Sequence, residues 1–153
     1  MTTNYYIENR PWGWFKILLD TPTYKVKELL VKPGARLSYQ LHHKRSEHWF
    51  VVQGVATATI NDVEQTLAAG HSVDVPVETK HRIANNGAED VIFIEVQTGT
   101  YFGEDDIVRL SDDYNRLSIS DETSPCPLLC QGEGVTILSR LRRGENGKRG
   151  LAK

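Results

Sequence analysis

The chain has 153 residues, a formal net charge of −2, 39% hydrophobic and 25% charged residues. These values predict one soluble globular domain and exclude two of ordinary size, and the charge gives no reason to expect a nucleic-acid or anionic-membrane partner. No stretch approaches the roughly 20 apolar residues that span a bilayer, and the first residues lack the basic start and apolar block of a signal peptide. The expected location is the cytoplasm.

The segments between Tyr24 and Gln97 predict β-strands in close succession. Gly, Pro, Asn and Asp separate them at spacings of about ten residues, as in turn-linked strands. The strand-like runs are YKVKELLV (24–31), Ser38 to Gln53 with its WFVV run, VATATIND (55–62), HSVDVP (71–76), HRIANNG (81–87) and VIFIEVQ (91–97). The pattern predicts an all-β sandwich or barrel, with no long helix before residue 100.

The residue composition of the sequence changes after Gly99. GEDDIVRLSDDYNR (103–116) is acidic and predicts a short helix or an ordered loop packed on the barrel. We therefore place the barrel at 1–116 and a helical or irregular C-terminal extension at 117–153. The final 15 residues carry six Lys/Arg against one Glu, which is typical of a flexible tail, with docking onto an acidic partner as the alternative.

Two further features of the extension have open interpretations. VTILSRL (135–141) is either an edge strand or a helical turn. Cys126 and Cys130 are interpreted as free thiols, although they could pair or supply half of a metal site; no second CxxC or nearby histidine completes such a site.

The segment SYQLHHKRSEHW (38–49) holds three of the five histidines, a glutamine and a glutamate. Alternate residues of a strand share a face, so Gln40 and His42 point the same way. Glu47 follows a predicted turn, HKRS, and a hairpin of this size brings it opposite His42. These three side chains could bind Zn²⁺, Fe²⁺, Mn²⁺ or Ni²⁺, which would need a fourth ligand. A β-barrel could place His81 beside them. The alternative for any histidine is a surface residue, or a core residue satisfied by a backbone carbonyl.

The ordered pattern Gly34-x5-Gln40-x-His42-x4-Glu47-x6-Gly54, followed by Gly70-x5-Pro76-x4-His81-x3-Asn85, resembles the two motifs of the cupin superfamily. Cupins are small β-barrels that hold a metal inside. Gln40 stands where the first motif usually has His, and Glu78 stands where the second usually has Gly. The glutamine is similar to the phosphomannose isomerases, whose metal ligands are Gln, His, Glu and His.

The resemblance to the type II mannose-6-phosphate isomerase cupin extends over roughly residues 8–116. It rests on RPWG (10–13), YKVK (24–27), VKPG (31–34), HHKRSEHW (42–49), HR (81–82), IEVQ (94–97) and GEDDIVR (103–109). That module often forms the C-terminal half of a bifunctional enzyme with GDP-mannose pyrophosphorylase, whose nucleotidyltransferase half has no counterpart here. The resemblance implies a double-stranded β-helix (jelly-roll) barrel, and an expected homodimer because an open sheet edge invites pairing.

The resemblance also implies a reaction and a metal. The reaction is the interconversion of mannose 6-phosphate and fructose 6-phosphate. The implied ligands are Gln40, His42, Glu47 and His81, and the metal would polarise the carbonyl and stabilise the enediolate. Zn²⁺ fits this set, and Mn²⁺, Fe²⁺, Co²⁺ or Ni²⁺ remain open.

Candidates for the other roles come from charge and strand face. Arg45, Arg82 and Arg109 could bind the phosphate through their guanidinium groups; a solvated surface charge is the alternative, with equal weight for Arg82. Lys25 and Lys27 share one strand face, and the resemblance favours the interior, where one could transfer a proton. Glu95, on an otherwise apolar strand, is the second candidate. The identity of the base stays open.

The remaining histidines and the tryptophans are interpreted as structural. His43 and His48 flank the predicted ligands on other faces, His71 is expected to be exposed, and Trp12, Trp14 and Trp49 are expected in core or rim packing. Two rival functions remain. One is a sugar-phosphate-binding or regulatory module of polysaccharide synthesis without turnover. The other, ranked last, is a metal-dependent oxygenase, which typically needs more histidine ligands.

Overall fold

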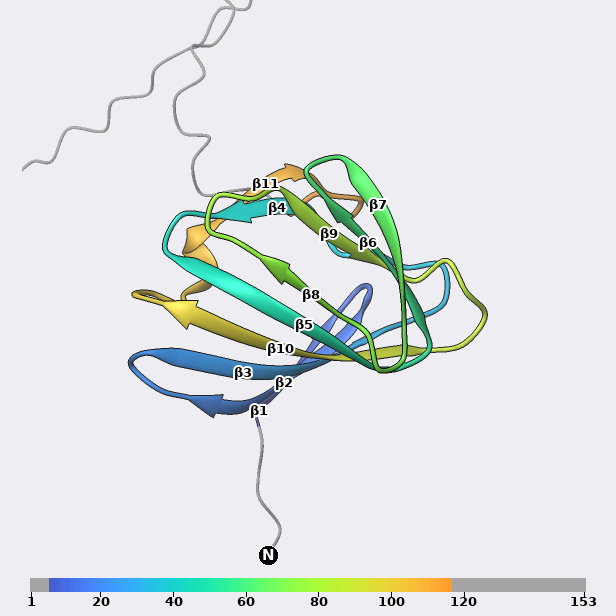
Figure 1. The fold of residues 1–153 in the computed structure, drawn as a ribbon, viewed down its shortest axis with the longest axis horizontal. Helices are drawn as coiled ribbons and strands as arrows, with labels where there is room; N and C mark the ends of the chain where they lie inside the picture. The colour runs from blue at the N-terminus through green and yellow to red at the C-terminus, as the bar shows by residue number, and fades with distance from the viewer. Residues whose placement is uncertain (1–5, 117–153) are drawn as a thin grey trace, which may run out of the picture. The chain divides into compact units, whose positions relative to one another are not determined.

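The computed structural model describes residues 6–116, which form two antiparallel β-sheets facing each other (Figure 1). In sheet order, the six-stranded sheet contains β1 (Tyr6–Arg10), β2 (Gly13–Asp20), β3 (Tyr24–Val31), β10 (Val91–Gly99), β5 (Arg45–Gln53) and β8 (Ser72–Val75). The five-stranded sheet contains β11 (Ile107–Ser111), β4 (Tyr39–His42), β9 (His81–Ala84), β6 (Val55–Ile60) and β7 (Val63–Ala68). The all-β prediction is confirmed.

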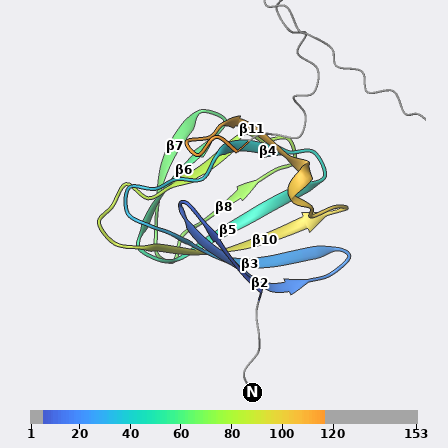
Figure 2. The ribbon, with the colours of Figure 1, turned by 180° about the vertical axis from the view of Figure 1, so that it is seen from behind.

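The one helical element between residues 6 and 116 is η1 (Glu104–Asp106), a single 3₁₀ turn. It connects β10 of the six-stranded sheet to β11 of the five-stranded sheet, and Figure 2 shows this segment from behind. In this part of the chain, no helix has the length and apolar character to cross a membrane. The predictions for Cys126, Cys130, 135–141 and the basic tail lie outside the described residues.

The inner face of the six-stranded sheet is divided into an apolar half and a polar half. Along β10, Val91 and Phe93 are buried apolar residues, whereas Glu95 and Gln97 are buried polar ones. Antiparallel pairing aligns the same change in the neighbours, since Glu95 lies opposite Lys27 of β3 and Gln97 opposite Glu47 of β5. The hydrophobic core therefore fills one half of the space between the sheets, and the other half is polar.

The apolar half explains why these strands pair in this register. Trp49, Val51, Phe93, Val31 and Ile83 are at most 2% exposed and belong to one cluster. Burying such side chains stabilises the fold by about 1.5–3 kcal/mol each. A slip of one residue would exchange them with the outward-facing set, so this half fixes the register of the polar half as well.

Non-glycine residues at positive φ occur at three places between residues 6 and 116, namely Asn61–Asp62, Glu78 and Asn115, and the first two bear on the fold. Asn61 and Asp62 have φ of 47° and 66° and link β6 to β7 in the backbone form that favours Asn and Asp. Glu78 has φ of 62°, so the position where related motifs usually carry glycine keeps the left-handed conformation here with a glutamate. Its backbone N–H donates to the carbonyl of His42 at 2.7 Å, which ties this loop to β4.

Three parts of the fold differ from the sequence prediction. The turn between His42 and Glu47 spans only His43 and Lys44, and it carries the chain from one sheet to the other instead of closing a hairpin. Residues 107–111, predicted within a helix or loop, form a strand because the alternating run IVRLS pairs with β4. The strands β1, β2 and β7 were not predicted from the sequence. The β2 segment, GWFKILLD, is a mostly apolar run, and β1 and β7 are mostly exposed, so none of them shows the alternation of a half-buried strand.

Candidate metal centre

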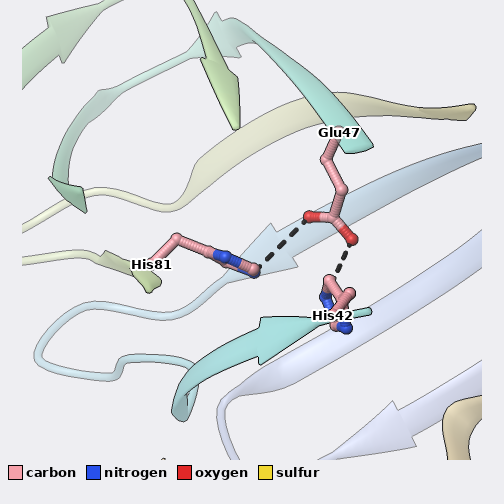
Figure 3. Close-up of side chains that lie close together, drawn as sticks. All are labelled: His42, Glu47 and His81. Carbon is pink, nitrogen blue, oxygen red and sulfur yellow. Dashed lines mark ion pairs between the residues drawn. The ribbon is translucent and has the colours of Figure 1, made fainter. Parts of the chain in front are cut away.

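Three side chains from three strands converge in the polar half of the barrel (Figure 3). His42 comes from β4, Glu47 from β5 and His81 from β9, and all three are buried. His42 Nε2 lies 3.1 Å from Glu47 Oε1, and His81 Nε2 lies 3.7 Å from Glu47 Oε2. Their ligand atoms all lie within 4.8 Å of one another, so they could hold a metal ion together.

Hydrogen bonds behind the cluster turn these donor atoms inward. His81 Nδ1 donates to the carbonyl of Thr79 at 2.7 Å, which leaves Nε2 with its lone pair; this nitrogen is buried and makes no hydrogen bond. The indole of Trp49 donates to Glu47 Oε2 at 3.0 Å and packs edge-on against the His81 ring. Such outer hydrogen bonds are what orient metal ligands in proteins, and the unused His81 nitrogen fits a bound cation.

Gln40, the fourth predicted ligand, lies beside this cluster. It is opposite His81 in the pairing of β4 with β9, and its Nε2 is 3.5 Å from His42 Nε2. The hydroxyl of Ser38 donates to Gln40 Oε1 at 2.6 Å. A half-turn of the carboxamide would direct Oε1 to the cluster and let Nε2 donate to Ser38, because a hydroxyl both donates and accepts. Gln40 can thus supply an oxygen ligand.

The electrostatics of the cluster favour the forms that bind metals. Burial by itself would raise the pKa of Glu47, but the hydrogen bond with His42 and the charges of His42, His81 and Arg45 hold it well below its usual range. Burial lowers the pKa of His81, against the opposing attraction of Glu47. A carboxylate and a neutral imidazole are the ligating forms, so the environment favours the metal-binding forms of Glu47 and His81.

The predicted proton-transfer residues separate into two groups. Lys27 and Glu95 are buried and line one pocket, with Lys27 Nζ 4.0 Å from Glu95 Oε1 and 3.2 Å from Glu104 Oε1. Burial, with the charge of Glu47, raises the pKa of Glu95 to about 8 against the attraction of Lys27 and Arg45. Lys25 does face inward, but its ammonium donates to the carbonyl of Phe102 at 3.2 Å and pairs with Asp20 at 3.0 Å. It is not among the pocket's lining residues.

The three arginines predicted to bind phosphate lie in three different settings. Arg45 is buried within the cluster, where it donates to Glu47 at 3.3 Å and to the carbonyl of Gly103 at 2.9 Å. Arg109 lines the pocket of Lys27 and Glu95, opposite Gln40 in the pairing of β11 with β4. Arg82 lines a separate surface pocket, lies over the ring of Tyr39 and donates to the carbonyl of Ser111.

Several residues of the site were missed by sequence reasoning. Arg10 and Arg116 line the same pocket as Arg109, although Arg10 lies in the RPWG segment, which could have drawn attention to it. Asp106 is buried and accepts the backbone N–H groups of His43 at 3.4 Å and Lys44 at 3.1 Å. Its place in an acidic stretch gave no local sign of a structural role, because its partners are more than 60 residues away.

Two facing antiparallel sheets around a buried His–Glu–His cluster give this chain the double-stranded β-helix fold, which solved cupin structures share. Solved structures of this kind include a double-stranded β-helix protein from Klebsiella pneumoniae (TM-score 0.56, 23% identity, 63% of this chain and 77% of that one). A second is the capsular polysaccharide assembling protein CapF from Staphylococcus aureus (TM-score 0.65, 24% identity, 72% of this chain and 35% of that one). At these identities the likeness concerns the fold alone.

The model of the family "Mannose-6-phosphate isomerase C-terminal" matches residues 2–112, so the chain belongs to this family. Its relatives include the alginate biosynthesis protein AlgA of Pseudomonas aeruginosa, 46% identical over 115 residues, which are 75% of this chain and 24% of that protein. Mannose-1-phosphate guanylyltransferase of Escherichia coli is 38% identical over 107 residues, 70% of this chain and 23% of that protein. The chain thus spans about a quarter of the length of these relatives.

Proposed function

We propose that this protein is a metal-dependent aldose–ketose isomerase that interconverts mannose 6-phosphate and fructose 6-phosphate. One observation carries the proposal: Glu47 of the His–Glu–His cluster lines the same pocket as the buried pair Glu95 and Lys27. The reaction needs a charge sink for the enediolate oxygens next to a group that moves a proton between C1 and C2. The family and the names of its relatives support a role in polysaccharide synthesis.

The metal site would be formed by Gln40, His42, Glu47 and His81. A divalent ion such as Zn²⁺ or Mn²⁺, bound there, supplies a Lewis acid that polarises the carbonyl oxygen and stabilises the enediolate. The chain's own contribution is to keep the imidazole of His81 neutral and aimed inward through Thr79, and to hold the Glu47 carboxylate through the indole of Trp49. The oxygen and nitrogen ligands suit several divalent metals.

Proton transfer falls to Glu95 with Lys27 beside it. In its ionised form, Glu95 takes the proton from C2 of the aldose and returns it to C1, while the proton of the O2 hydroxyl passes to O1. The same steps in reverse regenerate the aldose. The Lys27 ammonium lies 4.0 Å from Glu95 Oε1. It is therefore close enough to the reacting carbons to stabilise the negative charge of the enediolate while Glu95 holds the proton. Lys25 is assigned to structure, because the carbonyl of Phe102 and the carboxylate of Asp20 occupy its ammonium.

The phosphate would be held by arginines that line the pocket. Arg109, Arg10 and Arg116 line the pocket. Their guanidinium groups can match the oxygens of a phosphate bidentately. We assign Arg45 to holding the cluster together, since its side chain is 1% exposed and donates to Glu47 and to the carbonyl of Gly103. Arg82 is assigned to the outer surface, in the pocket that it shares with Tyr39.

A coupled assay that converts mannose 6-phosphate to fructose 6-phosphate tests the function directly. We expect turnover that a chelator abolishes and that Zn²⁺ or Mn²⁺ restores, and Glu95→Gln should lose turnover while it still binds metal. Metal-loaded protein that binds the sugar phosphate without converting it would instead support the rival function, a sugar-phosphate-binding or regulatory module without turnover. Metal-loaded protein that neither binds nor converts it would contradict the proposal.

Two expectations about the protein as a whole belong to the same proposal. We place the reaction in the cytoplasm, which follows from the sequence-based expectation above. We also expect a homodimer, since Phe50 and Val52 of β5 leave large apolar side chains 41% and 49% exposed on the outer face of the six-stranded sheet. Sedimentation velocity should give about twice the chain mass of 17.3 kDa; a monomer at micromolar concentration would contradict the expectation.

A further inference from the structure

Gln97 occupies a position between the metal cluster and the proton-transfer residue. It lies on β10, is 1% exposed and lines the pocket. Its Nε2 donates to Glu47 Oε1 at 3.1 Å and to Glu95 Oε1 at 2.8 Å. One amide group therefore uses both of its N–H donors on the two carboxylates of the site.

These two hydrogen bonds fix the direction of the carboxamide. Glu47 is a carboxylate surrounded by donors, and it can only accept. A half-turn of the Gln97 side chain would bring its oxygen against this carboxylate, with repulsion in place of a hydrogen bond. The oxygen is therefore held away from both carboxylates, and its orientation does not depend on a ligand.

The oxygen of Gln97 is left without a partner inside the protein. Oε1 is buried and accepts no hydrogen bond, although buried acceptors are almost always satisfied. Its side chain lines the same pocket as Glu47, Glu95 and Lys27. The wall thus offers the unpaired amide oxygen of Gln97 and the carboxylate of Glu47 as hydrogen-bond acceptors to whatever enters. A ligand with several hydroxyl donors complements such a wall.

We infer that Gln97 Oε1 accepts a hydrogen bond from a hydroxyl group of the bound sugar phosphate and so selects ligands that carry this hydroxyl. The inference rests on the proposed function for the class of ligand. It adds a specificity-determining residue that neither transfers the proton nor holds the metal. Sites that hydrogen-bond a ligand hydroxyl reject analogues without it, because the buried acceptor is then left unpaired.

The test compares binding of hydroxyl-deleted ligands to two forms of the metal-loaded protein. Mannitol 6-phosphate lacks a carbonyl, so it binds without being isomerised, and its 2-, 3- and 4-deoxy derivatives each remove one donor. Calorimetry gives the Kd of each ligand for the wild-type protein, for Gln97→Met and for the surface control Gln65→Met on β7. Gln97→Asn serves as a second variant, because it keeps the amide and withdraws the oxygen by one methylene; the melting temperature shows which variants fold.

One deoxy derivative should bind the wild-type and Gln65→Met proteins about tenfold more weakly than the parent ligand, the value of one net hydrogen bond. For Gln97→Met or Gln97→Asn, the same derivative and the parent should bind equally. This loss of discrimination is specific to a direct contact with the hydroxyl. A merely structural effect would raise the Kd of all four ligands by the same factor.

Two results would overturn the inference, and they differ from each other. If the wild-type protein binds all four ligands equally, or if the variants keep its discrimination, no hydroxyl contacts Gln97, while the isomerase assay still stands by itself. If the wild-type protein binds neither mannitol 6-phosphate nor mannose 6-phosphate, the ligand class is wrong and the proposed function falls with it. Equal binding of all four ligands to the wild-type protein overturns the inference even if neither Gln97 variant folds.

Discussion

Glu47 illustrates how single residues create the site. Its two oxygens face His42, His81, Arg45, Gln97 and the indole of Trp49. A buried carboxylate without partners would be costly, and it tolerates burial because donors and cations surround it. Of the groups that contact Glu47, a metal would use His42 and His81 as further ligands. Replacing either histidine should therefore weaken metal binding strongly and change the stability of the fold less.

His81→Ala should abolish tight metal binding. The change removes one of the three converging ligands and its buried Nε2. Metal content after dialysis, measured by mass spectrometry, should fall to background. His71→Ala is the control, because His71 is exposed and bonds only to the nearby carbonyl of Ala68. Retention of stoichiometric metal by His81→Ala would refute the centre.

Lys27→Met and Lys25→Met should differ in turnover although the two lysines share a strand face. Lys27 lines the pocket beside Glu95, and Lys25 does not. We expect kcat to fall by about 100-fold or more for Lys27→Met, the usual cost of removing a group that stabilises charge in the transition state, and by much less for Lys25→Met. Equal losses in stopped-flow or coupled assays would argue that both lysines act only through the structure.

At the scale of elements, the connection from β4 to β5 decides the geometry of the cluster. Only His43 and Lys44 separate these strands, so His42 and Glu47 sit on opposite sheets but face each other. Gly99, at the end of β10, packs against this connection, and a Cβ there would lie 2.2 Å from the carbonyl oxygen of Lys44. Asp106, the last residue of η1, accepts both backbone N–H groups of the turn. These two hydrogen bonds connect the turn to η1.

Asp106→Ala should loosen this turn and weaken metal binding. Two partly buried backbone donors would lose their charged acceptor, which costs about 1–3 kcal/mol, and the spacing of His42 and Glu47 would relax. Urea denaturation should report the loss of stability, and a competition titration with a chromogenic chelator should report a Kd raised about tenfold or more. Asp105→Ala is the matched control, since this neighbour is exposed and bonds only to Tyr101; equal effects would remove the role from Asp106.

At the scale of the whole molecule, the barrel joins a rigid apolar half to a half filled with buried charge. Lys27, Arg45, Glu47, Glu95 and Asp106 are all buried in or beside the polar half. Such groups stabilise a fold only when they are paired, so this half depends on its ion pairs and hydrogen bonds. A metal that binds only the folded cluster adds to its stability.

Metal loading should therefore raise the melting temperature. At a free Zn²⁺ concentration about 100 times Kd, linkage gives about 2.7 kcal/mol, or roughly 10 °C for a domain of this size. Differential scanning fluorimetry with and without chelator measures the shift. The His81→Ala protein should show none, and a shift of equal size in that variant would mean that Zn²⁺ stabilises another site.

The predicted metal ligands could be recognised in the sequence, whereas most contacts of the residues around them could not. The four predicted metal ligands belong to an ordered, recognisable spacing, and three of them converge in the structure. Core packing was predicted for Trp49, but its hydrogen bond to Glu47 was not, and the contacts of Gln97, Asp106, Arg10 and Arg116 at the site also escaped prediction. Their roles depend on partners far along the chain or on the opposite sheet, and no local pattern reports such contacts.

The sequence by itself determined the all-β class, most of the strands after Tyr24 and the family, because side-chain alternation, turn residues and motif spacing are local properties of the chain. Only the tertiary structure decided which polar residues share one pocket. Whether Lys27 or Lys25 meets Glu95, and whether Arg45 faces solvent or Glu47, depends on how two sheets pack. That packing is set by the apolar half of the barrel, through contacts between residues that are distant in sequence.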